Sequence, residues 1–119
     1  MLSLEWARKF AEDWVDAWNA HDLERILEHY TDDFVFSSPL IRERGFAPDG
    51  VLHGKDAVRP YWTAGLEAQP PIRFEIRELF LGADCLTIRY QSIARTLVCE
   101  TFFFGNDGKV VRSAAAYAA

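Results

Sequence analysis

Near its C-terminus the chain reads Val98-Cys99-Glu100-Thr101-Phe102-Phe103-Phe104 and continues Gly105-Asn106-Asp107-Gly108. The first stretch is apolar and aromatic, as is typical of a β-strand, and the second favours a tight hairpin turn. We therefore predict a strand over residues 96–104 that pairs with an antiparallel last strand over residues 109–117.

Glu100 is the unusual residue of this predicted strand. Because residues two apart share one face of a strand, Glu100 lies on the same face as Phe102 and Phe104. An ionised carboxylate on an apolar face is costly unless it is paired or takes up a proton. Glu100 is therefore expected either to face a pocket or to pair with a group such as Arg89 or a tryptophan N–H.

The residues before this hairpin continue the sheet. Apolar and polar residues alternate over residues 72–77 and again over 86–91, with a turn at Gly82-Ala83-Asp84 between them. This period of two predicts two more strands, and a tight turn near residues 92–95 connects them to the next strand.

The first half of the chain has a helical period instead. Large apolar residues recur every four positions over residues 4–20, which predicts a helix that begins after Ser3. A second, shorter helix is predicted after Asp22, with Tyr30 on its buried side, and Thr31-Asp32-Asp33 is expected to form the turn that follows. Residues 34–37 are predicted as a short strand, residues 39–55 as irregular, and residues 56–68 as a third helix with Tyr61 and Trp62 on its inner side.

This order predicts one α+β domain over residues 1–119, with helices packed on one face of a curved antiparallel sheet. Half of the residues are hydrophobic and 14% are aromatic, enough for a core and for the lining of a small-molecule cavity. The net charge of -5 and the scattered basic residues argue against nucleic acid and anionic membranes as partners.

No apolar stretch approaches the roughly 20 residues that span a bilayer, and the N-terminus lacks the features of a signal peptide. The expected location is cytoplasmic, which also suits Cys85 and Cys99 as free thiols, because they are offset along the predicted hairpin. Three dispersed histidines give no ligand spacing, so neither a metal nor a cofactor is expected.

Four stretches resemble the nuclear transport factor 2-like superfamily, and most closely its SnoaL-like and ketosteroid isomerase-like branch. They are Trp18-Asn19-Ala20-His21-Asp22-Leu23, Tyr30-Thr31-Asp32-Asp33-Phe34, His53-Gly54-Lys55-Asp56-Ala57 and Asp107-Gly108-Lys109-Val110-Val111. The resemblance implies a cone-shaped barrel, in which a strongly curved antiparallel sheet wraps around three N-terminal helices and leaves an apolar cavity at its open end. It also implies a homodimer formed through the sheet.

The resemblance places three positions of the family's isomerases on this chain. The tyrosine of the first helix corresponds to Trp14, the aspartate base to Ser38, and the neutral acid that holds the oxyanion to Glu100. Serine is no proton carrier near neutral pH, and an indole is a weaker acid than a phenol. The steroid isomerase reaction itself is therefore not expected, and Glu100 remains as the candidate catalytic residue.

The candidate ligand-binding residues share an inward position on the predicted elements or at the open end of the cone. They are Trp14, Trp18, Ser38, Trp62, Tyr90, Phe102, Ser113 and Tyr117. For Trp14 and Trp18 a core position is an equal alternative, and for Ser38 the alternative is a turn before Pro39. Arg42-Glu43-Arg44 is either a solvated cluster or a lid that recognises an acidic group.

The expected partner is a small hydrophobic or aromatic molecule. If the protein is an enzyme, we expect a cofactor-free isomerase, dehydratase or cyclase that acts next to a carbonyl or hydroxyl group. The alternative is a non-catalytic ligand-binding or dimerisation module, which the missing base favours. Epoxide hydrolysis is not favoured because no aspartate accompanies Arg89 on the strands.

Overall fold

The computed structural model describes residues 2–119. The helices are α1 (Leu4–Asn19), α2 (Leu23–Leu27), α3 (Pro39–Glu43), α4 (Lys55–Glu67) and the single 3₁₀ turn η1 (Ile93–Arg95). The strands are β1 (Tyr30–Ser37), β2 (Val51–His53), β3 (Glu75–Leu81), β4 (Cys85–Gln91), β5 (Leu97–Phe104) and β6 (Val110–Tyr117).

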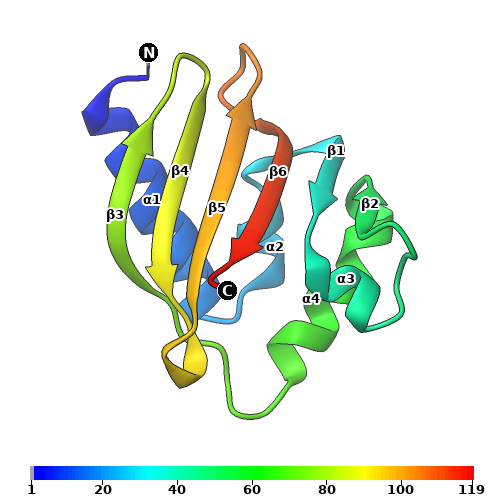
Figure 1. The fold of residues 1–119 in the computed structure, drawn as a ribbon. Helices are drawn as coiled ribbons and strands as arrows, with labels where there is room; N and C mark the ends of the chain where they lie inside the picture. The colour runs from blue at the N-terminus through cyan, green and yellow to red at the C-terminus, as the bar shows by residue number, and fades with distance from the viewer. Residues whose placement is uncertain (1) are drawn as a thin grey trace.

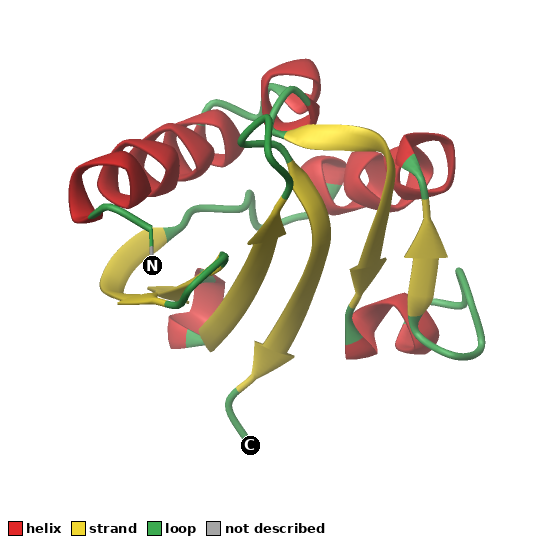
Figure 2. Ribbon diagram, turned by 90° about the horizontal axis from the view of Figure 1, so that it is seen from above, coloured by secondary structure: helices red, strands yellow, loops and turns green. Residues whose placement is uncertain are grey.

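The six strands form one curved sheet in the order β2-β1-β6-β5-β4-β3. All neighbours are antiparallel except β1 and β6, which run parallel, and the sheet stays open between its edge strands β2 and β3. Helix α1 crosses behind β3, β4 and β5, while α4 lies beside the other half of the sheet (Figures 1 and 2). The predicted α+β class with a strongly curved sheet is therefore confirmed.

The register of β5 confirms the predicted faces of the C-terminal hairpin. Glu100 lies opposite Ile88 of β4 and Ala115 of β6, on the inner face of the sheet. Arg89 lies on the outer face, where its guanidinium donates to Glu78 at 3.0 Å. Glu100 consequently has no counter-ion from Arg89.

Helix α1 is held at its start by a cap and along its length by an aromatic core. The Ser3 hydroxyl accepts a hydrogen bond from the backbone N–H of Trp6 at 3.1 Å, as predicted for the N-cap. Trp14 is fully buried, with its ring centroid 5.1 Å from that of Phe102 and 5.7 Å from that of Phe74. Burial of each such side chain contributes about 1.5–3 kcal/mol, so this contact fixes α1 against the sheet.

The region between the second helix and α4 differs from its prediction. Tyr30 begins strand β1 instead of ending a helix, and Thr31-Asp32-Asp33 belongs to β1, at a shift in its register with β6. Residues 39–55, predicted as irregular, contain α3 and β2. Pro39 favours a helix start because its fixed φ suits the first turn, and a three-residue edge strand leaves little periodicity to detect.

Cys85 and Cys99 both have free thiols; Cys85 pairs with Phe103 and Cys99 with Arg89 in the β4–β5 register. Among residues 2–119, no helix has the length and hydrophobicity needed to cross a membrane.

Candidate functional site

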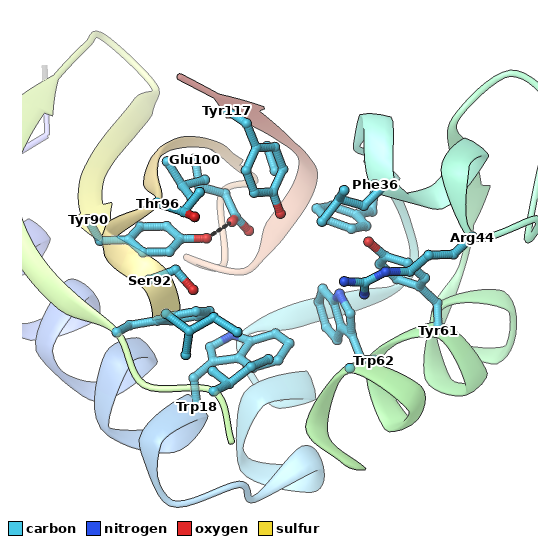
Figure 3. A pocket seen from close by; sticks show the side chains of 17 residues that line it. Trp18, Phe36, Arg44, Tyr61, Trp62, Tyr90, Ser92, Thr96, Glu100 and Tyr117 are labelled. Atoms are coloured by element: carbon cyan, nitrogen blue, oxygen red, sulfur yellow. Dashed lines mark hydrogen bonds between the residues drawn. The ribbon is translucent and has the colours of Figure 1, made fainter. Parts of the chain in front are cut away.

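A cavity of about 310 Å³ lies between the inner face of the sheet and the helices α1 and α4. Its walls are mostly aromatic, from residues on five different elements or loops: Trp18, Phe36, Tyr61, Trp62, Phe74 and Tyr90. Figure 3 shows the labelled rings of Trp18, Phe36, Tyr61, Trp62 and Tyr90 around an open centre, with Glu100 on one side. The volume is at the lower end of the range of about 300–1,000 Å³ that is usual for ligand sites.

Glu100 reaches this cavity from the middle of β5. The residue is only 4% exposed, and the Tyr90 hydroxyl donates a hydrogen bond to its Oε1 at 2.8 Å. Its other carboxyl oxygen points toward the open centre in Figure 3. Burial raises the pKa of Glu100 from 4.5 to about 7, and the bond from Tyr90 opposes this rise. Near neutral pH the carboxyl can therefore both accept and release a proton.

Three phenols surround the same space. Burial raises the pKa of Tyr90 well above its ordinary value, and the charge of Glu100 raises it further. Burial also raises the pKa of Tyr117 to about 12, and Glu100 adds to this rise, while the nearby Ser38 hydroxyl and Arg44 lower it. Burial also raises the pKa of Tyr61. All three hydroxyls thus keep their protons at neutral pH and can donate hydrogen bonds to an oxygen.

Arg44 stands at the opposite side of the cavity from Glu100 (Figure 3). It follows directly after α3, where its backbone N–H donates to the carbonyl of Leu40 at 2.9 Å. Its guanidinium carbon lies 5.9 Å from the centroid of the Tyr61 ring. The charged cluster Arg42-Glu43-Arg44 is divided between two sites. Arg44 lines the cavity, whereas Arg42 and Glu43 line a separate, open groove together with Ser38.

Five of the nine predicted site residues line the cavity together: Trp18, Trp62, Tyr90, Glu100 and Tyr117. The other four do not line it. Trp14 and Phe102 are fully buried in the core, where the Trp14 Nε1–H donates to the Tyr30 hydroxyl at 2.9 Å. On α1 the cavity lining begins one helical turn further along, at Trp18.

Ser38 and Ser113 are likewise not among the residues that line the cavity, although the Ser38 hydroxyl lies near the phenols of Tyr61 and Tyr117. The Ser38 hydroxyl caps α3 by accepting from the backbone N–H of Leu40 at 3.3 Å, so Ser38 connects the end of β1 to a helix that begins at Pro39. Ser113 is 1% exposed, and its hydroxyl has no hydrogen-bond partner among the described residues.

Sequence reasoning left Tyr61, Phe36 and Phe74 out of the site. The signal for Tyr61 was present, since it was predicted on the inner side of its helix beside Trp62. Among residues 2–119, no group of three or more histidine, cysteine or acidic side chains is placed to hold a metal ion.

The cone-like α+β fold with a cavity at its open end defines a protein of the nuclear transport factor 2-like class. The sequence profile of the SnoaL-like domain matches residues 11–116, and the chain belongs to this family. No curated protein sequence matches the chain significantly.

Solved structures agree with this assignment. A SnoaL-like protein from Burkholderia thailandensis is 41% identical, with 98% of each chain covered and a TM-score of 0.93. SalBIII, described as an epoxide hydrolase/cyclase-like enzyme in pyran ring formation of the polyether salinomycin, is 17% identical, with 99% of this chain and 95% of that chain covered and a TM-score of 0.76. A putative polyketide cyclase from Sinorhizobium meliloti is also 17% identical, with 91% and 94% covered and a TM-score of 0.74. The last two similarities concern the fold alone.

Proposed function

We propose that the cavity binds a small hydrophobic or aromatic molecule and that Glu100 transfers a proton within it. The reaction class is cofactor-free isomerisation, dehydration or cyclisation next to a carbonyl or hydroxyl group. The observation that carries this proposal is the Glu100 carboxyl, with a pKa of about 7, facing a cavity whose other nearby polar groups include neutral phenols.

The proton steps follow from these groups. The Glu100 carboxylate takes a proton from the carbon next to a carbonyl, and the electron pair of that C–H bond moves to the carbonyl oxygen. The hydroxyls of Tyr61 and Tyr117 donate to the resulting enolate oxygen. Return of the proton from Glu100 to another carbon completes an isomerisation. Alternatively, the enolate expels a β-hydroxyl group, which takes the same proton and leaves as water.

Two features favour this reaction class over others. SalBIII and the putative polyketide cyclase have the same fold, and both are described as cyclases or cyclase-like. This similarity supports the proposal by analogy. Epoxide hydrolysis through an aspartate–arginine relay finds no support, because Arg89 lies on the outer face and pairs with Glu78.

Binding is tested by tryptophan fluorescence, because Trp18 and Trp62 line the cavity while Trp6 lies at the surface. A panel of small aromatic ketones and phenols is titrated into the wild type, Glu100→Gln, and Trp6→Phe as the control that keeps the cavity tryptophans. Saturable quenching in the wild type and in Trp6→Phe is expected. The absence of binding to any of them would overturn the proposal.

Proton transfer is tested on the ketones that bind, without knowledge of the natural substrate. In D₂O, the wild type is expected to speed the exchange of hydrogen for deuterium at the carbon next to the carbonyl, followed by NMR. Glu100→Gln is expected to bind the ketone and lose this exchange. Binding with no exchange in the wild type would instead identify a non-catalytic binding module.

We also propose that two copies pair through the outer face of the sheet. Small or apolar side chains gather there on neighbouring strands: Cys99 and Thr101 on β5 lie opposite Ala116 and Ala114 on β6. A surface of small side chains allows two copies of the sheet to approach closely, as a self-complementary interface requires. Light scattering is expected to give the mass of a dimer for the wild type and of a monomer for Ala116→Arg. A monomeric wild type would contradict the proposal.

A further inference from the structure

We propose that the ligand of this cavity is a small organic acid, whose carboxylate binds Arg44 while its apolar or aromatic body fills the space toward Glu100. This inference rests on the proposed function, because it requires that the cavity binds a ligand. It adds the chemical class of that ligand and the residue that selects it.

The geometry places a cation and an acid at opposite ends of an aromatic cavity. Arg44 enters from the end of α3 and Glu100 from the centre of β5, with the rings of Trp18 and Trp62 below the space between them (Figure 3). A ligand that spans this space meets a positive charge at one end and a proton carrier at the other. Aromatic walls contact the part of the ligand between these ends.

Within the described residues 2–119, the Arg44 guanidinium has no carboxylate partner. None of the ion pairs among residues 2–119 includes it, whereas Arg25, Arg59 and Arg89 pair with Asp13, Glu24 and Glu78. The guanidinium lies over the face of the Tyr61 ring. This cation–π contact is attractive and leaves the N–H groups of the guanidinium available. Those N–H groups match the two oxygens of a carboxylate.

Arg44 is also separate from Glu100. Burial and the Tyr90 hydroxyl set the pKa of Glu100, whereas Arg44 acts on the phenols of Tyr61 and Tyr117, whose pKa values it lowers. The guanidinium therefore lies near two hydroxyl donors and is not the counter-ion of the buried acid. A carboxylate bound there receives hydrogen bonds from the guanidinium, and the hydroxyls of Tyr61 and Tyr117 stay available for the substrate oxygen nearer Glu100.

The carboxylates near Arg44 in the sequence do not occupy this place. Glu43 lines the separate open groove with Arg42 and Asp49, and it is not among the residues that line the cavity. The volume of about 310 Å³, at the lower end of the usual range for ligand sites, favours a compact molecule.

The test uses matched ligands that differ only in charge. Small aromatic acids, such as phenylpropanoic and naphthoic acid, and their primary amides are titrated by calorimetry into the wild type, Arg44→Gln and Arg42→Gln. The wild type is expected to bind each acid at least about tenfold more tightly than its amide, as is usual for a charge-assisted hydrogen bond. Arg44→Gln is expected to remove this preference and leave amide binding unchanged.

Arg42→Gln is the matched control, because it removes the same charge two residues away without touching the cavity. It is expected to keep the preference for acids. Since Arg44 is exposed, Arg44→Gln is also expected to unfold at the same urea concentration as the wild type.

Three results would overturn the inference. Equal affinity for acids and amides in the wild type would refute Arg44 recognition while leaving the proposed function intact. Equal losses in Arg42→Gln and Arg44→Gln would show a general effect of charge and no specific site. Binding of neither acids nor amides would overturn this inference. If the ketones and phenols of the fluorescence panel also fail to bind, the proposed function is overturned as well.

Discussion

Glu100→Gln is expected to make the protein more stable than the wild type above neutral pH and about equally stable in acid. Burial raises the pKa of Glu100 from 4.5 to about 7, so the folded state holds this proton more tightly than the unfolded state. The stabilisation that the proton provides is complete below 4.5 and is lost as the pH rises through about 7. Glutamine has no such proton to lose, and its amide oxygen can still accept from Tyr90.

The size of the effect follows from the two pKa values. At about 1.4 kcal/mol for each pH unit, the difference between 4.5 and about 7 corresponds to about 3 kcal/mol. The free energy of unfolding of Glu100→Gln, minus that of the wild type, should therefore increase by about 3 kcal/mol between about pH 4 and about pH 8. The comparison with the variant matters because other groups also titrate in this range.

Two of these groups act in the opposite direction. The Asp13 pKa is lowered, first by its hydrogen bond with Arg25, and the His29 pKa is lowered by burial. Each contributes stability at higher pH that is lost as the pH falls through its folded-state pKa. Both residues remain in Glu100→Gln, so their contributions cancel in the difference.

The assay is urea unfolding followed by circular dichroism at closely spaced pH values. Glu78→Gln serves as the control, because Glu78 is an exposed carboxylate paired with Arg89 and should show no comparable rise. If the stability curves of the wild type and Glu100→Gln run parallel across this pH range, Glu100 does not titrate near neutrality and the reasoning is refuted.

Three further substitutions probe the packing, each measured by urea unfolding. Phe102→Ala empties a fully buried position and is expected to cost about 3–5 kcal/mol, far more than Phe103→Ala on the outer face; equal costs would contradict the assigned strand faces. Ser113→Ala removes a buried hydroxyl without a partner and is expected to keep or raise stability by about 1 kcal/mol, whereas a clear loss would reveal a missed hydrogen bond. Ala94→Gly relieves a backbone φ of 55° and is expected to gain up to about 1 kcal/mol; a loss would argue against this turn conformation.

The strands could be predicted well because their local pattern agrees with the tertiary structure. In β4 and β5 the inner residues Ile88 and Glu100 alternate with outer residues such as Arg89 and Thr101, so one sequence period defines both faces. The segment around α3 and β2 could not be predicted this way. A helix of five residues and a strand of three are too short to show a period, and tertiary contacts decide their conformation.

The site was predictable in part. Glu100 could be identified because a carboxyl on an apolar strand is chemically conspicuous. Trp14 and Trp18 could not be told apart, since they lie one helical turn apart on the same side of α1. Only the packing shows that Trp14 meets Phe102 in the core while Trp18 borders the cavity. Arg44 reaches the cavity because α3 forms, and α3 itself escaped prediction.

The most direct measurement is the pKa of the Glu100 side-chain carboxyl, obtained from the pH dependence of its carbon chemical shift by NMR, with Glu100→Gln used to assign the signal. A midpoint near 7 is expected, which would establish a proton carrier at neutral pH inside the cavity. A midpoint near the ordinary value of 4.5 would show a permanently ionised carboxylate and contradict proton transfer by Glu100.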